Sequence, residues 1–184
     1  MDDRKNLILD LDESIICGLD NKQEKEFNLG NEFQKYNMDN EYMIYERPDL
    51  QEFLDEIFSK FNVSIWTAAS REYCMFIVDK IILNPKNYKV RGNRKLEYVF
   101  FSNHCSISKK LSKNKNNFKN LSILTNNFKL DGFDLQNTYI IDDNIDVKQF
   151  NGTKCFSIKP FDVRSEKSFD DNQLEDLLVK LKKL

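Results

Sequence analysis

Five short apolar runs, rich in β-branched or aromatic side chains, constrain the fold of this chain more than any other feature. They are Leu7–Leu9, Val63–Trp66, Tyr98–Phe101, Thr138–Ile141 and Lys154–Ile158. Between them, apolar residues recur at helical spacing over 50–58, over 73–81 and in a final segment from about 171 to 184. Buried strands that alternate with helices are typical of a parallel sheet covered on both faces. The pattern therefore predicts an α/β fold with a doubly wound parallel sheet.

One long segment after the first strand interrupts this alternation. Residues 20–42 are polar and weakly patterned, and they end in the strand-like Tyr42–Tyr45. We interpret about 18–46 as a short β-rich insertion over the sheet. The length of 184 residues suits one compact domain, so we predict that 1–184 form a single domain.

Charge and composition leave the class of partner open. Lys and Arg number 28 and Asp and Glu 30, so the net charge of −2 neither requires nor excludes a nucleic acid. The Lys/Asn/Ser-rich stretch 106–119 is interpreted as a solvated surface loop, which we favour over a nucleic-acid patch. No apolar run reaches the roughly 18 residues of a membrane span. We expect a monomer inside the cell, nuclear or cytoplasmic, whose four cysteines are mostly buried thiols.

Carboxylates follow the first strand directly. Asp10 and Asp12 lie where the strand Leu7–Leu9 ends, and open parallel sheets bind ligands at the carboxyl ends of their strands. Two neighbouring carboxylates repel each other unless a cation or a shared proton neutralises them. Mg²⁺ prefers such hard oxygen ligands, so the pair favours a magnesium site. By itself this short pattern is weak evidence, because an acidic turn at a strand end would produce it too.

Two later strands end in residues that fit the same site. Thr67 follows Val63–Trp66 with a hydroxyl that could hydrogen-bond a phosphate, and Ser70 is placed to cap the next helix. Asp142 and Asp143 follow Thr138–Ile141 and add a second pair of carboxylates. Together the strand ends predict a site for Mg²⁺ and a phosphate group.

The order of these motifs resembles that of the haloacid dehalogenase (HAD) superfamily, which has a Rossmann-like fold. The segments Arg47–Leu54, Trp66–Ser70 and Lys119–Ser122 are similar to those of phosphatases that act on the C-terminal domain (CTD) of RNA polymerase II. The spacing agrees best with the small, single-domain branch, the small CTD phosphatase or NLI-interacting factor-like family, which has no large cap. Ser14 stands where that family usually has threonine, and it keeps the hydroxyl.

The resemblance implies a mechanism. Asp10 attacks phosphorus and forms an aspartyl-phosphate, while Asp12 first protonates the leaving oxygen and then activates water. Mg²⁺ is held by Asp10, the Asp12 carbonyl, Asp142 and Asp143.

The resemblance also implies that phosphate oxygens are bound by Ser14, Thr67 and a lysine. The resemblance favours Lys119 as that lysine, because Leu121–Ser122 follows it, and it leaves Lys109 and Lys110 as alternatives.

The implied substrate is a phosphoserine or phosphothreonine in a protein or peptide, with the RNA polymerase II CTD as one candidate. Tyr73 matches a residue that contacts the substrate in the family, although it could equally be a core aromatic. Three alternatives remain open: a phosphatase for nucleic-acid 3′ ends, which the basic stretch 106–119 keeps in view, a phosphatase for small metabolites, and an inactive phosphopeptide-binding scaffold.

Overall fold

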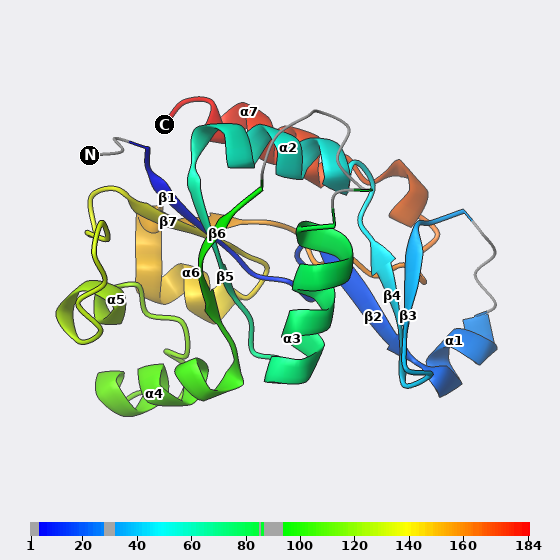
Figure 1. The fold of residues 1–184 in the computed structure, drawn as a ribbon, viewed down its shortest axis with the longest axis horizontal. Helices are drawn as coiled ribbons and strands as arrows, with labels where there is room; N and C mark the ends of the chain where they lie inside the picture. Colours follow the sequence, from blue (N-terminus) through cyan, green and yellow to red (C-terminus); the bar gives the residue numbers. More distant parts are fainter. Residues whose placement is uncertain (1–3, 28–31, 85, 87–93) are drawn as a thin grey trace.

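Two sheets of different kinds form the framework of the chain in a computed structural model, which describes residues 4–27, 32–84, 86 and 94–184 (Figure 1). The larger sheet has five parallel strands in the order β6-β5-β1-β7-β8. Its strands are β1 (Asn6–Leu9), β5 (Asn62–Trp66), β6 (Leu96–Phe100), β7 (Thr138–Asp142) and β8 (Cys155–Ser157). All five predicted strands are present, and the predicted doubly wound α/β fold is confirmed.

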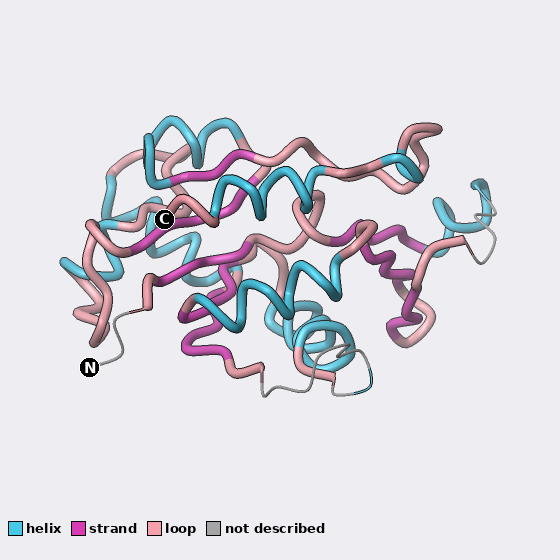
Figure 2. The backbone as a smooth tube through the Cα atoms, turned by 90° about the horizontal axis from the view of Figure 1, so that it is seen from above, coloured by secondary structure: helices cyan, strands magenta, loops and turns pink. Residues whose placement is uncertain are grey.

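Successive side chains of β1 pack against different sets of helices, because helices cover both faces of the sheet (Figure 2). Leu7 and Leu9 belong to one core cluster, with residues of the helices α2, α3 and α7, whereas Ile8 belongs to a second cluster with residues of α4, α5 and α6. The covering helices are α2 (Leu50–Lys60), α3 (Arg71–Ile77), α4 (Ser102–Ser112), α5 (Ser122–Asn126), α6 (Ile145–Asn151) and α7 (Gln173–Leu181). β1 is therefore a central strand, buried on both faces.

The insertion forms a second, antiparallel sheet of order β2-β4-β3. Its elements are β2 (Ile16–Asp20), α1 (Asn21–Phe27), β3 (Lys35–Met38) and β4 (Tyr42–Glu46), and residues 28–31 lie outside the described part. A small core of its own, which includes Leu19, Phe33, Tyr45 and Phe161, holds this sheet against the segment after β8. The predicted β-rich insertion is confirmed, although β2 and β3 were not apparent from the sequence.

The prediction of a surface loop over 106–119 is wrong in its first half. Residues up to Ser112 continue the helix α4, and only the remainder is loop. The helix was missed because its buried positions are Cys105 and Ser108, so its sequence shows no apolar stripe. Ser108 donates its hydroxyl hydrogen to the carbonyl of Asn117 (3.0 Å), which folds the loop back onto the helix.

Smaller differences occur at the ends of the predicted helices. The periodicity over 73–81 corresponds to α3 followed by a π-helical turn, η1 (Val78–Ile82), and the final helix is shorter than predicted. The four cysteines are buried and unpaired, as expected. Within the described ranges, no helix combines the length and apolar character that a bilayer crossing demands.

Candidate active site

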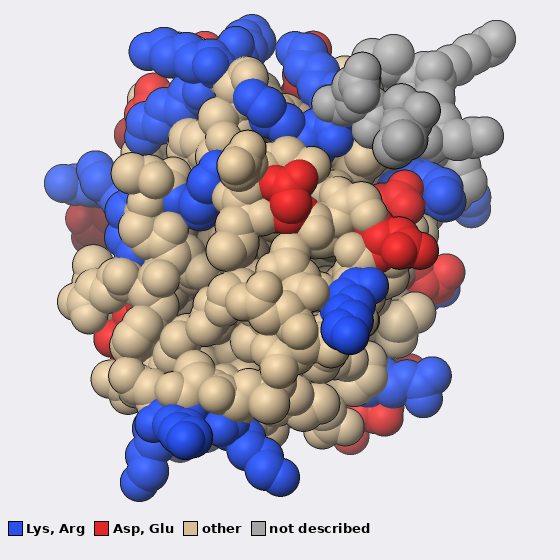
Figure 3. Space-filling view, turned by 90° about the vertical axis from the view of Figure 1, so that its left-hand side faces the viewer, with Lys and Arg blue, Asp and Glu red and all other residues tan. Residues whose placement is uncertain are grey.

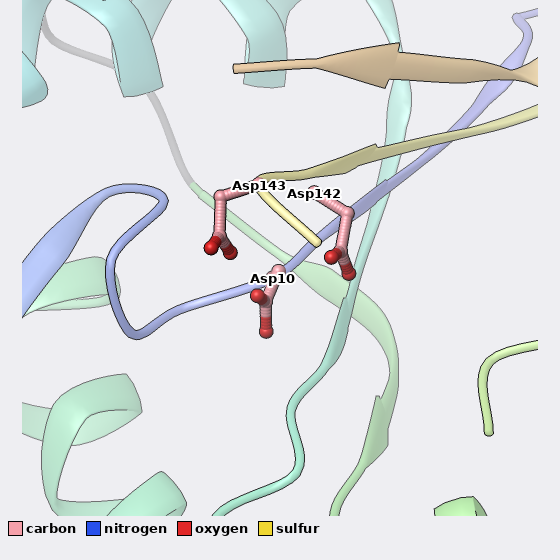
Figure 4. Close-up of side chains that lie close together, drawn as sticks. All are labelled: Asp10, Asp142 and Asp143. Atoms are coloured by element: carbon pink, nitrogen blue, oxygen red, sulfur yellow. The ribbon is translucent and has the colours of Figure 1, made fainter. Parts of the chain in front are cut away.

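Three aspartates converge where β1 and β7 end, side by side in the middle of the parallel sheet (Figure 4). Asp10 follows β1, Asp142 is the last residue of β7, and Asp143 comes next. One carboxylate oxygen of each lies within 4.8 Å of the others. The neighbours of β1, which are β5 and β7, both come later in the chain, so this edge is also the point where the strand order reverses.

Lys119 is buried inside this cluster. Its Nζ lies 2.6 Å from Asp10 Oδ1 and 2.7 Å from Asp142 Oδ2, and the side chain is 2% exposed. Asn151 holds the backbone here, because its amide donates to the Lys119 carbonyl (2.8 Å). Burial alone would lower the pKa of Lys119, but the two carboxylates outweigh it and raise that pKa. Lys109 and Lys110, by contrast, are exposed on α4.

The cluster has more negative than positive charge. Three carboxylates face a single ammonium group, and both oxygens of Asp142 are engaged, one by Lys119 and the other by the Asn144 N–H (2.9 Å). Burial, and then the charge of Asp10, raise the pKa of Asp143 to about 6. Hard oxygen donors with uncompensated negative charge fit a divalent cation such as Mg²⁺. The residues best placed to hold it are Asp10 and Asp143, with Asp142 beside them.

Ser14 lies between the acids. Its Oγ is 3.3 Å from Asp10 Oδ2 and 3.2 Å from Asp143 Oδ1, and it accepts a hydrogen bond from the Asp143 N–H (3.2 Å). A hydroxyl has one proton, so it can donate to only one of these carboxylates at a time. In this geometry Ser14 orients the carboxylates, and its predicted contact with phosphate stays a prediction.

Asp12 is held by Tyr73, which lies on α3. The Tyr73 hydroxyl donates to Asp12 Oδ1 at 2.6 Å, which leaves Oδ2 for proton transfer. Burial raises the pKa of Asp12 to about 6, with Asp10 adding to the rise and the Tyr73 hydrogen bond opposing it. That pKa suits a group that both gives and takes a proton near neutral pH.

Gly18 on β2 makes the contact between Tyr73 and Asp12 sterically feasible. A Cβ atom at this position would lie 2.2 Å from the Tyr73 hydroxyl oxygen, well inside van der Waals contact. A glycine within a strand often marks such a close approach, but the sequence did not indicate which group approaches. The insertion therefore helps to place Asp12.

Thr67 follows β5, the parallel neighbour of β1, so it lies at the same edge of the sheet as Asp10. It is 1% exposed, and its Oγ accepts the Ala69 N–H at 3.0 Å, which leaves its proton for a ligand. As predicted, Ser70 caps α3, because its Oγ accepts the Tyr73 N–H (3.2 Å).

Arg47 is a supporting residue that the motif analysis did not single out for a role. Its guanidinium donates to the Ser14 carbonyl (2.7 Å) and makes a bidentate pair with Asp171 (2.8 Å for each bond). The side chain is fully buried, so a charged group here requires partners of this quality. The signal in the sequence was an arginine before Pro48, with nothing to show which carbonyl it binds. Arg47 fixes the turn that follows Asp10 and Asp12.

The raised carboxyl pKa values predict an unusual pH dependence of stability for the metal-free protein. Asp12 and Asp143 have pKa values of about 6 in the fold, above the ordinary value of 3.8 for an aspartate, and that of Asp142 is raised too. The folded state therefore binds protons more tightly, and the free energy of unfolding falls as pH rises from about 4 through 6. We expect a lower melting temperature at about pH 7.5 than at about pH 5 in EDTA.

Thermal melts across this pH range, with EDTA or with Mg²⁺, would check the expectation. Bound cations compete with protons for the carboxylates, so Mg²⁺ should remove the loss of stability at the higher pH. The double variant Asp12→Asn/Asp143→Asn serves as the control, and its melting temperature in EDTA should depend less on pH. A melting temperature that rises from pH 5 to 7.5 in EDTA would contradict the raised pKa values of these half-buried acids.

The sequence of the chain matches a known phosphatase family. The family model of the NLI interacting factor-like phosphatases matches residues 5–184, nearly the whole chain. The chain belongs to this family. The NLI interacting factor-like phosphatases are CTD phosphatase-like members of the HAD superfamily, so the resemblance noted from the motifs is confirmed.

Viral proteins are among its relatives. Protein 355R of Invertebrate iridescent virus 6, named for its likeness to CTD phosphatases, is 41% identical over 176 residues, which cover 92% of this chain and 93% of the relative. Protein 355R of Invertebrate iridescent virus 3 is 35% identical over 175 residues, with coverage of 93% and 91%. These relatives match this NLI interacting factor-like chain over almost their whole length.

Solved structures share the fold. Fcp1, described as an essential RNA polymerase II CTD phosphatase, superposes with a TM-score of 0.54 at 20% identity and covers 97% of this chain. Fission yeast Fcp1 bound to beryllium fluoride gives a TM-score of 0.57 at 20% identity, again over 97% of this chain. The chain spans only about half of each Fcp1 chain, 50% and 51%. At 20% identity, this structural similarity supports the HAD fold of the present chain and nothing further.

Proposed function

We propose that this chain is a Mg²⁺-dependent phosphatase that hydrolyses phosphoserine or phosphothreonine in proteins through an aspartyl-phosphate on Asp10. The observation that carries the proposal is Lys119, a buried cation within 2.7 Å of both Asp10 and Asp142. Membership in a phosphatase family agrees with it. As part of the same proposal, the enzyme is a monomer that acts inside the cell, in the nucleus or the cytoplasm.

Two residues carry out the chemistry. An oxygen of Asp10 attacks phosphorus, the bond from phosphorus to the serine oxygen breaks, and Asp12 gives its proton to that oxygen. Asp12 then takes a proton from water as the water oxygen attacks phosphorus, which releases inorganic phosphate and restores the Asp10 carboxylate. Lys119 and Thr67 hold phosphate oxygens in line during both steps.

Asp10 and Asp143, with Asp142 beside them, would hold Mg²⁺, and Asp12 was predicted to add its carbonyl. When bound, the ion would offset the repulsion between the Asp10 carboxylate and the phosphate and polarise the phosphoryl oxygens. Without it, two negative groups must approach each other in a buried, low-dielectric site.

The surroundings of Asp12 support a peptide as substrate. A cleft of about 300 Å³ begins at Asp12 and Glu13 and continues along the insertion past Gly18, Gln23 and Arg164. Its lining is mixed polar and apolar, and it runs from Asp12 along the insertion, so an extended peptide can follow it away from the site. The Fcp1 and 355R names make a CTD-like peptide the first one to test.

Hydrolysis of p-nitrophenyl phosphate, with Mg²⁺ and with EDTA, tests the proposed activity. We expect turnover only with the metal, and inhibition by beryllium fluoride with Mg²⁺, which together mimic a phosphorylated carboxylate. A panel of phosphopeptides, a 3′-phosphorylated oligonucleotide and sugar phosphates then ranks the substrates by kcat/KM. A folded protein that binds phosphopeptides without turnover would be an inactive binding scaffold. A higher kcat/KM for the oligonucleotide or for the sugar phosphates would replace the peptide as the proposed substrate.

Tyr73→Phe should weaken protonation of the leaving group. Without its hydroxyl the Asp12 carboxyl loses the bond that orients it, so kcat/KM for a phosphoserine peptide should fall about tenfold. For p-nitrophenyl phosphate, whose leaving group needs little protonation, kcat/KM should fall less than about threefold. The measurement is kcat/KM for a series of phosphate esters of increasing leaving-group pKa.

Tyr42→Phe is the matched control for this substitution, since Tyr42 packs against the edge of Tyr73 (ring centroids 5.5 Å apart). Tyr42→Phe should leave the dependence of kcat/KM on leaving-group pKa unchanged. Gly18→Ala, which displaces the Tyr73 hydroxyl, should make that dependence steeper. Equal losses for every ester in Tyr73→Phe would show a general structural role and exclude an effect on Asp12.

A further inference from the structure

Positive charge gathers on one side of the candidate active site. Residues 98–130 contain six lysines and no aspartate or glutamate, although the chain as a whole has a net charge of −2. One of the six is Lys119 itself. Four others, Lys109, Lys110, Lys113 and Lys115, lie exposed at the end of α4 and in the loop after it, and together they form what we name the α4 lysine surface. Figure 3 shows Lys and Arg side chains along the lower edge of the molecule, where α4 lies.

This surface adjoins the site because α4 is attached to the strand end that carries Thr67. The Ser102 N–H donates to the Ala69 carbonyl (2.9 Å), and the Cys105 thiol lies 3.5 Å from the Thr67 carbonyl. The opposite side of the site is acidic, with Glu13 exposed beside Asp12 and with seven acidic against three basic residues in the described part of the insertion, 16–27 and 32–46. An anionic substrate is therefore attracted to the α4 side and repelled from the insertion side.

Phe118 connects the surface to the cluster in space. Lys109 Nζ lies 5.5 Å from the centroid of the Phe118 ring, and Lys119 Nζ lies 5.8 Å from the same centroid. The two ammonium groups therefore lie within about 11 Å of each other. An extended peptide covers such a span with roughly three residues.

We infer that the α4 lysine surface binds a second anionic group of the substrate, about three residues from the phosphate that is hydrolysed. The partner is a peptide that is phosphorylated more than once, or acidic on one side of its phosphoserine. This inference rests on the proposed function and adds to it the substrate class. A peptide is favoured over a nucleic acid because the basic surface lies on one side only, whereas the acidic insertion would repel a continuous phosphate backbone.

Matched peptides test the inference. One peptide carries a single phosphoserine, and the others add a non-hydrolysable phosphonate three residues before or after it. We expect the wild-type kcat/KM to be at least about fivefold higher for one of the doubly charged peptides, through a lower KM, with the advantage lost in high salt. The double variant Lys109→Glu/Lys113→Glu should lose that advantage while p-nitrophenyl phosphate turnover stays within about twofold. If the protein with Lys109→Glu/Lys113→Glu does not fold, the neutral variant Lys109→Gln/Lys113→Gln takes its place in the same measurement.

The matched control is Lys180→Glu/Lys183→Glu, in and just after α7, which lies at the opposite end of the molecule from α4 (Figure 1). It should keep the wild-type preference. An active wild type without the preference, or a preference that survives the α4 double variant, would overturn the inference. So would a 3′-phosphorylated oligonucleotide with a higher kcat/KM than either peptide and the same sensitivity to the α4 variant. A wild type that fails to hydrolyse p-nitrophenyl phosphate with Mg²⁺ would instead overturn the proposed function.

Discussion

Replacing Asp10 by asparagine should abolish turnover and at the same time raise the thermal stability of the metal-free protein. An amide is a poor nucleophile for phosphorus, so kcat should fall by at least about 10³-fold. The gain in stability has a separate cause. Asp10 contributes to the raised pKa values of Asp142 and Asp143, so loss of its charge relieves repulsion among buried carboxylates that share one lysine. Each kcal/mol of relief raises the melting temperature by about 2–4 °C at this size.

Two measurements check both halves of this prediction. Steady-state turnover at equal folded concentration gives the loss of activity, and thermal melts in EDTA give the stability. Asp131→Asn, at an exposed position, is the matched control and should change neither. Full activity in Asp10→Asn would exclude Asp10 as the nucleophile, and a lower melting temperature in EDTA would show that Lys119 more than compensates the repulsion.

Lys119→Met should lose both activity and stability. The substitution leaves the buried carboxylates of Asp10 and Asp142 without their cation, and removal of one partner of a buried ion pair costs about 3–5 kcal/mol. Turnover should fall by at least about 10²-fold even with saturating Mg²⁺, because a fixed charge on the phosphate is gone. Chemical denaturation in EDTA and kcat with Mg²⁺ are the measurements.

The same experiment compares the alternative lysines. Lys182→Met, just after α7, controls for the substitution itself. If Lys109 or Lys110 held the hydrolysed phosphate, then Lys109→Met or Lys110→Met would lower kcat for a small aryl phosphate more than Lys119→Met does. We expect the reverse order, because both of these side chains are exposed on α4 while Lys119 is buried against Asp10.

The strands of the parallel sheet were predictable because each is a short apolar run between helices, and the central ones are buried on both faces. β1 and β7 are examples, and the polar residues that follow them converge because parallel strands end at one edge of the sheet. The insertion was only partly predictable. Its strands cover a small core with one face, so its sequence has few apolar residues, and β3 has none that is fully buried. The helix α4 was hidden for a related reason, since it buries cysteine and serine.

Within the candidate site, sequence order identified which groups assemble but not how they contact one another. The spacing of Asp10 and Asp142 could not show that Lys119 lies between them, or that Ser14 lies between Asp10 and Asp143. Contacts that cross from the insertion to the sheet were likewise hidden. Gly18 and Tyr73 are 55 positions apart, and only the packed fold shows that one leaves room for the other.

The pair between Arg47 and Asp171 also bears on how the protein matures during its synthesis. Arg47 secures the turn after β1, but its charge is balanced by a residue that a ribosome adds more than a hundred positions later. Until Asp171 has emerged, the nascent chain carries an unmatched guanidinium where the phosphoryl-transfer centre will form. Catalytic competence should therefore be acquired late in translation, and contacts so distant in sequence are typical of slower folding.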